Sequence, residues 1–332
     1  MKKIVIVLIC ILLLCGCNNN SEKNVVNVLN WSSYIPFEVI SDFENETGIK
    51  VNYGTYSSNE ELLAKISSSK EGTYDLIFPS DYMIELMISK GMLEEIDKTK
   101  IQNFDKINPM FLEQEFDKDN KYSLPFLAAT SVIAVNRNNI KDKISSYNDL
   151  LRIEYKNNIV LIDDQRIMIG MALQALGYKM NEVNDTKILQ AKDWLLNLNK
   201  NIKAFDSDSP KTFLITGETD IGVIWNAEAL IAKDYNSNIE IIYPEDGFGI
   251  SLDNYALVKG AKNKDNAYKF IDYILRKDVN KKITDEYPYI NTTYENMNLQ
   301  KEELENILYN GTYVENIGNK ISLFDKVWAQ IK

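Results

Sequence analysis

The sequence predicts an α/β protein of two domains built on parallel sheets. Its 332 residues are too many for one ordinary hydrophobic core, so we expect two domains. Strand-like apolar runs alternate with amphipathic helix patterns three times between residues 25 and 91, and the alternation starts again at residue 130. Such strand–helix repeats are typical of parallel sheets covered by helices.

The first block can be assigned from its apolar spacing and its turn residues. Short runs rich in Val, Ile, Leu and Tyr predict strands at 25–31, 49–56 and 74–80. Pro36 suits the first turn of a helix that ends near Gly48. Ser58 and Glu61 have the spacing of a capping box for a second helix. A third helix should end at Gly91.

The second block follows the same pattern. We expect strands at 130–137, 158–164, 219–226 and 239–244. Helices should start at 165 and cover 186–201, and helical segments over 264–286 and a helical tail complete the chain. The formal net charge is −11 and the sequence contains no basic cluster, which argues against nucleic-acid binding.

Residues 1–16 have the pattern of a cleaved leader. Lys2 and Lys3 precede the apolar run "IVIVLICILLL", which is too short for an ordinary membrane span. The following "LCGC" resembles a bacterial lipobox, with Cys17 as the lipidated residue. We therefore expect a lipoprotein signal peptide at 1–16 and a lipid anchor that holds the protein on the cell membrane, facing the periplasm or the exterior. An uncleaved anchor or a plain secretory signal is the alternative.

Composition excludes several kinds of active site. Histidine is absent, and the three cysteines, Cys10, Cys15 and Cys17, all lie in or next to the leader. Nucleophilic sites that need histidine and zinc sites made of His or Cys therefore cannot form. We expect no cofactor and no metal.

Aromatic and acidic side chains gather where the predicted strands end. In an open α/β sheet, ligands bind beyond the carboxyl ends of the strands. Those positions hold Trp31, Ser32, Tyr34, Ser80, Asp81, Tyr82, Asp163, Asp164, Trp225 and Asn226, with Asp253 and Tyr287 later in the chain.

This set of residues favours an organic cation as the ligand. An ammonium group over an aromatic face gains roughly 0.5–2 kcal/mol, and a hydrogen bond to a charged group adds about 1.5–3 kcal/mol. A flexible amine therefore needs acids at its nitrogens and rings along its methylenes. Asp163 has a plainer interpretation as a helix cap. Outside this set, Trp194 and Trp328 fit core residues.

Longer stretches resemble one family, the spermidine/putrescine-binding proteins of bacterial polyamine ABC transporters. The resemblance covers about 24–332 and rests on "LNWSSYIP", "ETGIKVNYGTYSSNEELLAKI", "YDLIFPSDYMIELMISKGMLEEID", "IDDQRIMIGMALQALGY", "GVIWNAEA" and "NKDNAYKFIDYILRKDV". It implies a two-lobed periplasmic-binding-protein-like fold with the ligand in the cleft between the lobes. It also implies a non-enzymatic role: capture of spermidine or putrescine and delivery to the permease subunits of an ABC transporter. We expect a monomer.

The resemblance assigns roles to single residues. The aromatic box would be Trp31, Tyr34, Tyr82, Trp225 and Tyr287, the acids Asp164 and Asp253, and the polar groups Ser32 and Ser80. Three positions depart from the family pattern: Ile167 replaces an acid, Ser251 a tryptophan and Val314 an amide. Each loss can weaken a polyamine by a tenfold factor, since about 1.4 kcal/mol is tenfold.

We expect lobe 1 to hold 24–129 plus 253–296 and lobe 2 to hold 130–252 plus 297–332, because the chain returns late to an apolar run near residue 255.

Other functions remain open. A binding protein for a different cationic amine is the nearest alternative, and an iron-binding role is weaker because no histidine assists. A glycosidase using Asp164 and Asp253 would need carboxyl groups about 5–5.5 Å or about 6.5–9.5 Å apart. An adhesin would show an exposed apolar patch instead of a cleft.

Overall fold

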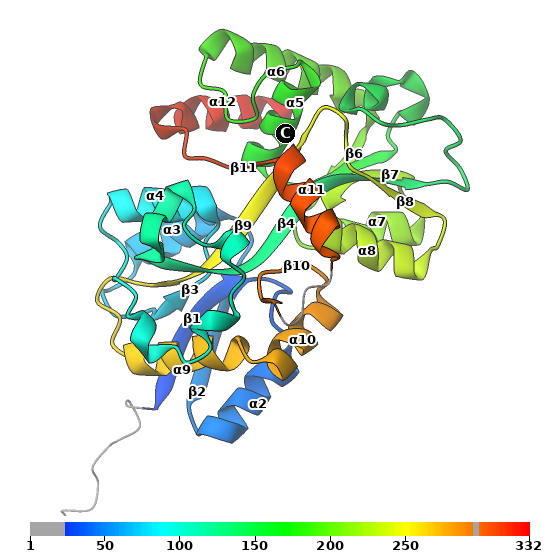
Figure 1. The fold of residues 1–332 in the computed structure, drawn as a ribbon. Coiled ribbons are helices and arrows are strands. Elements are labelled where there is room, and N and C mark those ends of the chain that lie inside the picture. The colour runs from blue at the N-terminus through cyan, green and yellow to red at the C-terminus, as the bar shows by residue number, and fades with distance from the viewer. Residues whose placement is uncertain (1–23, 295–298) are drawn as a thin grey trace, which may run out of the picture.

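The computed structural model describes residues 24–294 and 299–332. The predicted signal peptide and the lipidation site Cys17 lie outside these residues. The described chain forms two α/β lobes that share a long curled sheet (Figure 1). The strand order is β2-β1-β3-β9-β4-β7-β5-β6, with β10 and β8 paired to β4 and β11 paired to β9.

The first lobe contains the N-terminal strands and the helices that cover them. Its strands and helices are β1 (Val25–Trp31), α2 (Phe37–Thr47), β2 (Lys50–Tyr56), α3 (Asn59–Ser68), β3 (Leu76–Ile77), α4 (Asp81–Ser89), α9 (Lys264–Ile274), α10 (Lys277–Glu286) and β10 (Ile290–Asn291). β1 pairs in parallel with β2 and β3, as the sequence predicts, but β3 then pairs antiparallel with β9. Ser58 caps α3 by accepting a hydrogen bond from the backbone N–H of Glu61.

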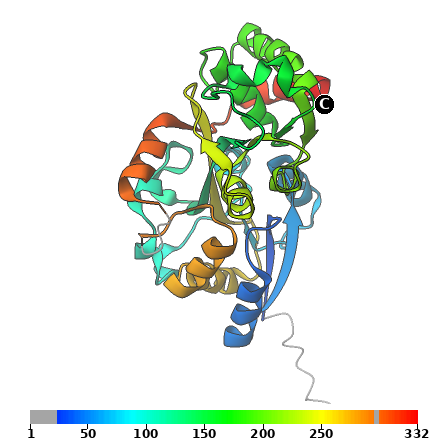
Figure 2. The same ribbon diagram turned by 90° about the vertical axis from the view of Figure 1, so that its right-hand side faces the viewer.

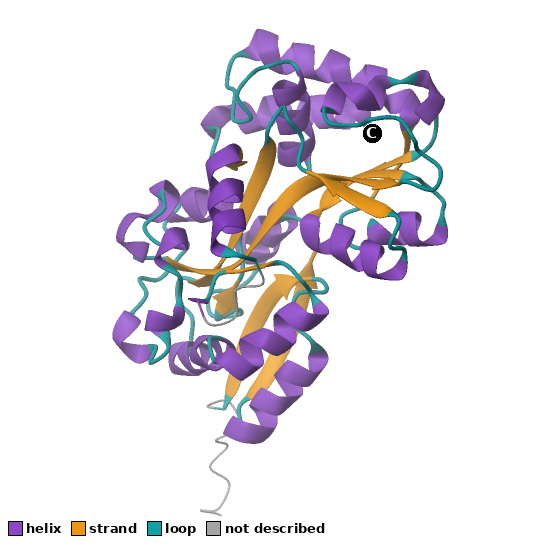
Figure 3. Cartoon of the chain, turned by 45° about the vertical axis from the view of Figure 1, so that its right-hand side comes forward, coloured by secondary structure: helices purple, strands orange, loops and turns teal. Residues whose placement is uncertain are grey.

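The second lobe is built the same way. Its strands and helices are β5 (Ile159–Leu161), α5 (Gln165–Ala175), α6 (Asp185–Leu198), β6 (Ile202–Phe205), α7 (Lys211–Thr216), β7 (Ile221–Trp225), α8 (Asn226–Tyr235), β8 (Ile239–Ile242) and α12 (Ile321–Ile331). Here β5 pairs in parallel with β6 and β7. The helices lie on both faces of these strands (Figure 3), and β5 and most of β7 are buried, whereas β6 at the edge of the sheet is partly exposed.

Two long strands, β4 (Ser123–Asn136) and β9 (Phe248–Leu257), connect the lobes (Figure 2). Residues 123–130 of β4 pair with β9, whereas residues 131–136 pair with β7 and β8. The other end of β9 pairs with β11 (Gly311–Tyr313), which follows α11 (Lys301–Asn310). The predicted lobe boundaries at 129/130 and 252/253 fall within these paired strands and remain a proposal.

Two expectations about strands were incomplete. The first half of β4 was not predicted, because Pro125 interrupts the pattern and proline normally marks strand edges. The central strand expected at 74–80 is reduced to Leu76–Ile77, since the residues after it turn toward α4.

Candidate ligand-binding site

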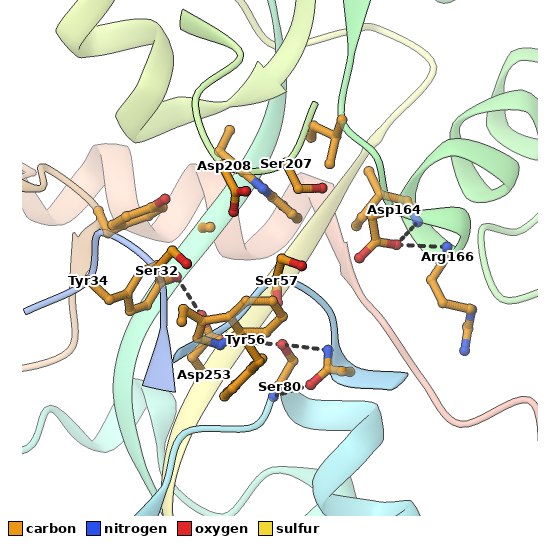
Figure 4. A pocket seen from close by; sticks show the side chains of 18 of the residues that line it. Ser32, Tyr34, Tyr56, Ser57, Ser80, Asp164, Arg166, Ser207, Asp208 and Asp253 are labelled. Carbon is orange, nitrogen blue, oxygen red and sulfur yellow. Dashed lines mark hydrogen bonds between the residues drawn. The ribbon is translucent and has the colours of Figure 1, made fainter. Parts of the chain in front are cut away.

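A cavity lies between the lobes where the strand ends of both meet (Figure 4). Eight of the nine predicted binding residues line it: Trp31, Ser32, Tyr34, Ser80, Tyr82, Asp164, Trp225 and Asp253. The cavity encloses an empty volume of about 740 Å³, part of which is open to solvent. The structure thus brings together residues that lie far apart in the sequence.

Asp253 is the buried anion of this cavity, and it lies in the middle of β9. Tyr34 Oη donates a hydrogen bond to Oδ2 of Asp253 at 2.5 Å, and Ser80 Oγ donates to Oδ1 at 2.6 Å. Only 3% of its surface is exposed. Burial raises the pKa of Asp253 to about 6, against the opposing effect of these hydrogen bonds. A carboxylate accepts up to about four hydrogen bonds, so Asp253 has capacity left for a cationic donor.

An aromatic wall stands beside this carboxylate. Trp31, at the end of β1, has its ring centroid 4.6 Å from that of Tyr56 and 6.4 Å from that of Tyr34. Its indole Nε1 donates to the carbonyl oxygen of Phe78 at 2.9 Å, which fixes the ring orientation. Because this N–H is already used, Trp31 offers the ligand an aromatic surface and no free donor.

Asp164 lines the cavity from the second lobe. It also caps α5, a role predicted for Asp163 from the sequence. Its Oδ1 caps α5 by accepting hydrogen bonds from the backbone N–H groups of Arg166 and Ile167, at 2.7 and 3.0 Å. Asp163 was expected to be the cap but instead pairs with Lys332 at 2.5 Å. Oδ2 of Asp164 makes no hydrogen bond to any described residue, and burial raises the pKa of Asp164.

Tyr82 and Trp225 complete the predicted walls, from α4 and from the end of β7. Tyr82 is buried and its hydroxyl donates to Glu60 at 3.1 Å. Trp225 is only half-buried, at the point where β7 leads into α8. Nearby Glu228 is an acid of the lining that already has a cation, since both its oxygens bind Lys211 Nζ at 2.8–2.9 Å.

Tyr287 is the predicted residue that does not line the cavity. It is half-buried against the core of the first lobe, and burial together with Glu286 raises its pKa to about 12. Tyr289 lines the cavity instead, with its ring centroid 4.6 Å from that of Tyr34. The intervening Pro288 obscured this choice in the sequence, and a ligand role for Tyr287 remains a prediction.

Further lining residues were missed: Ser33, Tyr56, Ser57, Asn59, Ala129, Ile162, Arg166, Ser207 and the acid Asp208 (Figure 4). Tyr56 and Ser57 follow the end of β2, so the strand-end argument applied to that strand would have found them. Arg166 gives no such signal, because it lies inside the apolar run of α5. Its guanidinium carbon lies 5.2 Å from the ring centroids of both Tyr82 and Phe324.

The positions that depart from the family pattern all face this cavity. Ile167, Ser251 and Val314 are buried and line it. Two of the three bring only apolar atoms, so one part of the wall lacks polar groups. Of the two Trp residues expected in the core, Trp194 is buried, whereas Trp328 is half-buried beside Phe205 in a shallow groove.

The described residues contain neither a metal-binding cluster nor a membrane-spanning helix. No cluster of three or more His, Cys, Asp or Glu side chains is placed to hold a metal ion in residues 24–294 and 299–332. Among these same residues, no helix combines the length and the apolar character that crossing a membrane requires.

Comparison with known proteins identifies the family of this chain. The model of the bacterial extracellular solute-binding protein family matches residues 38–303. The chain is 35% identical to the spermidine/putrescine-binding periplasmic protein of Escherichia coli over 94% of its own length and 92% of that protein.

Solved structures with the same fold include two close relatives. The spermidine/putrescine ABC transporter substrate-binding protein PotD from Streptococcus pneumoniae has a TM-score of 0.76 at 30% identity, covering 93% of this chain and 98% of that one. The TpPotD lipoprotein of Treponema pallidum has a TM-score of 0.84 at 26% identity, covering 93% and 99%. The chain belongs to the bacterial extracellular solute-binding protein family.

Proposed function

We propose that this solute-binding protein captures a polyamine in the cavity between its lobes and delivers it to the permease of an ABC transporter. The ligand-binding residues would be Trp31, Ser32, Tyr34, Ser80, Tyr82, Asp164, Trp225 and Asp253, with Tyr289 added to the wall and Tyr287 close behind it.

The observation that carries this proposal is the environment of Asp253. Its carboxylate is buried, oriented by the hydroxyls of Tyr34 and Ser80, and has no basic partner among the described salt bridges. A buried charge without a partner is costly. An ammonium group is the simplest ligand that removes this cost, and the rings of Trp31 and Tyr289 then contact its methylenes.

The relatives support the same ligand class. The Escherichia coli protein is named for spermidine and putrescine, and the Streptococcus pneumoniae structure for an ABC transporter that handles the same compounds. These proteins are named for binding and transport, so we infer that this chain also binds a solute and is not an enzyme.

The anchor, the partners and the oligomeric state belong to the same proposal. Lipidation of Cys17 after cleavage would hold a monomer at the membrane beside its permease, and the Treponema pallidum relative is described as a lipoprotein. Growth of producing cells with labelled palmitate tests this: the wild type should incorporate label and Cys17→Ser should not.

Calorimetry tests the ligand. The purified protein should bind at least one of putrescine, cadaverine, spermidine and spermine, whereas N,N′-diacetylputrescine, which has no charge, should not bind. Binding of the diacetylated compound as tightly as the parent amine, or no binding of any amine, would contradict the proposal.

A further inference from the structure

We propose that Asp208 is a third ligand-binding acid, which binds the outermost nitrogen of a triamine at the opening of the cavity. This inference rests on the proposed polyamine function and adds to it a residue that distinguishes triamines from diamines.

Asp208 lies beside Asp164 because two neighbouring strands end together. β5 and β6 are parallel, and their last residues, Leu161 and Phe205, are paired across the sheet. Asp164 and Asp208 each follow three residues later, and both line the cavity. Neighbouring strands lie about 4.8 Å apart, so the two carboxyl groups reach the cavity from adjacent positions on the edge of the second lobe.

Hydrogen bonds hold the loop of Asp208 against the segment that follows β5. Ser207 Oγ donates to the carbonyl oxygen of Asp163 at 2.9 Å. The backbone N–H of Asp208 donates to Oδ1 of Asp206 at 2.8 Å. These bonds fix the backbone of the loop and leave the side chain of Asp208 unused.

The carboxyl group of Asp208 is available to a ligand. Within residues 24–294 and 299–332 it makes no hydrogen bond or ion pair. Other acids of the lining already have partners: Asp253 accepts hydrogen bonds from two hydroxyls, and Glu228 binds Lys211. An ammonium group that binds Asp208 therefore has no internal cation to displace.

Arg166 brings a positive charge to the lining, but other acids offset it. The charges of Asp164, Asp81 and Glu60 all act on its guanidinium. These acids, and not Asp208, are its main charged neighbours, so the charge of Asp208 remains for the ligand.

Three acids of the cavity are graded in exposure from its floor to its opening. Asp253 on β9 is 3% exposed, Asp164 is half-buried and Asp208 is exposed. Asp208 also lines the neighbouring groove beside Phe205 and Trp328, so it lies where the cavity opens to solvent. Figure 4 shows the three acidic side chains around one open space. A chain of amine nitrogens that enters this space meets the three acids in turn.

A triamine suits this arrangement better than a diamine does. Three and four methylenes separate the nitrogens of spermidine by roughly 5 and 6 Å, so one ammonium group can pair with each acid. A diamine paired with Asp253 and Asp164 would leave Asp208 in water. Because Asp208 is exposed, its ion pair should be weak and sensitive to salt.

Titration calorimetry with spermidine and putrescine at low ionic strength tests this role. Asp208→Asn keeps the shape and removes the charge, so it should weaken spermidine about threefold to fivefold and putrescine by less than about twofold. Addition of about 0.5 M NaCl should remove most of the difference between variant and wild type. Asp208→Glu should restore the wild-type ratio of the two affinities.

Asp163→Asn is the matched control. It removes a negative charge from the same edge of the second lobe, but Asp163 lies outside the cavity lining. The ratio of the affinities for spermidine and putrescine should therefore stay at its wild-type value.

The outcomes separate this inference from the proposed function. Equal weakening of spermidine and putrescine in Asp208→Asn, or no weakening of either, would overturn the role of Asp208 while the polyamine function stands. Wild-type protein that binds only diamines would do the same. Wild-type protein that binds none of putrescine, cadaverine, spermidine and spermine would overturn both.

Discussion

Replacing Asp253 with asparagine should remove most of the affinity for an amine while leaving the empty protein folded. The pKa of Asp253 rises from 3.8 to about 6 on burial, so the ionised carboxylate is about 3 kcal/mol less stable in the empty cavity than in water. An ammonium ligand compensates this cost. Loss of one partner of such a buried pair costs about 2–5 kcal/mol, which corresponds to roughly 30-fold to 5,000-fold in Kd.

The stability of the empty protein should respond differently. Because the pKa is raised in the folded state, ionisation of Asp253 destabilises the fold progressively as pH rises from about 4 to about 6. Asp253→Asn removes this destabilisation at pH 7.5. It also leaves one of the two hydroxyls, of Tyr34 or Ser80, with a poorer acceptor, at about 1 kcal/mol. The unfolding temperature of the variant should therefore stay close to that of wild type or increase.

Calorimetry with putrescine at pH 7.5, together with thermal unfolding of the empty protein, measures both quantities. Asp163→Asn is the matched control: its carboxylate is paired with Lys332 and sits outside the cavity lining, so its affinity should remain within threefold of wild type. An Asp253→Asn variant that binds every amine within twofold of wild type would show that Asp253 is not the anion that binds the ligand.

Three further outcomes are expected. Wild-type affinity for putrescine should weaken about tenfold from pH 7 to pH 5, because Asp253, with a pKa of about 6, is roughly one-tenth ionised at pH 5. Titration calorimetry at both pH values should find this pH dependence much reduced in Asp253→Asn. An equal dependence in that variant would show that another group titrates. Trp225→Ala should lose roughly 1–3 kcal/mol of binding free energy with little change in unfolding temperature, whereas equal losses of both would identify a packing residue. Asp164→Ala should bind putrescine more weakly, and because it loses the cap of α5 its free energy of unfolding should fall by about 1 kcal/mol. Asp164→Ser should recover the stability but not the affinity. Recovery of the affinity by serine would contradict a role for the charge.

The site residues that lie at the ends of parallel strands could be predicted from the sequence. Trp31 ends β1 and Trp225 ends β7, and both strands have short, unmistakable apolar patterns. The carboxyl ends of such strands meet at one edge of a sheet, so the aromatic and acidic residues after them were found together. Tyr56 obeys the same rule and was missed only because it was assigned to its strand.

Other features depend on tertiary contacts that leave no local pattern. β9 contains Gly249, Asp253 and Asn254, which are disfavoured in strands, yet β4 and β3 on either side supply its pairing. The choice between Tyr287 and Tyr289 depends on how the chain turns at Pro288 before β10. Asp163 and Asp164 are neighbours, and only the path of the chain into α5 decides which of them caps the helix. Asp164 accepts the hydrogen bonds of the helix N-terminus, and Asp163 pairs with Lys332.

The pairing of β3 with β9 sets an order on how this chain can fold as it is synthesised. Leu76 lies beside Leu257, so the sheet of the first lobe stays open at one edge until the chain has been made as far as β9, which follows most of the second lobe. Contacts between such distant residues carry a high loop-closure cost and slow folding. The exposed edge of β3 is a site for mispairing during that interval. The strand that closes this edge also carries Asp253, so the binding site cannot form before the sheet of the first lobe is closed.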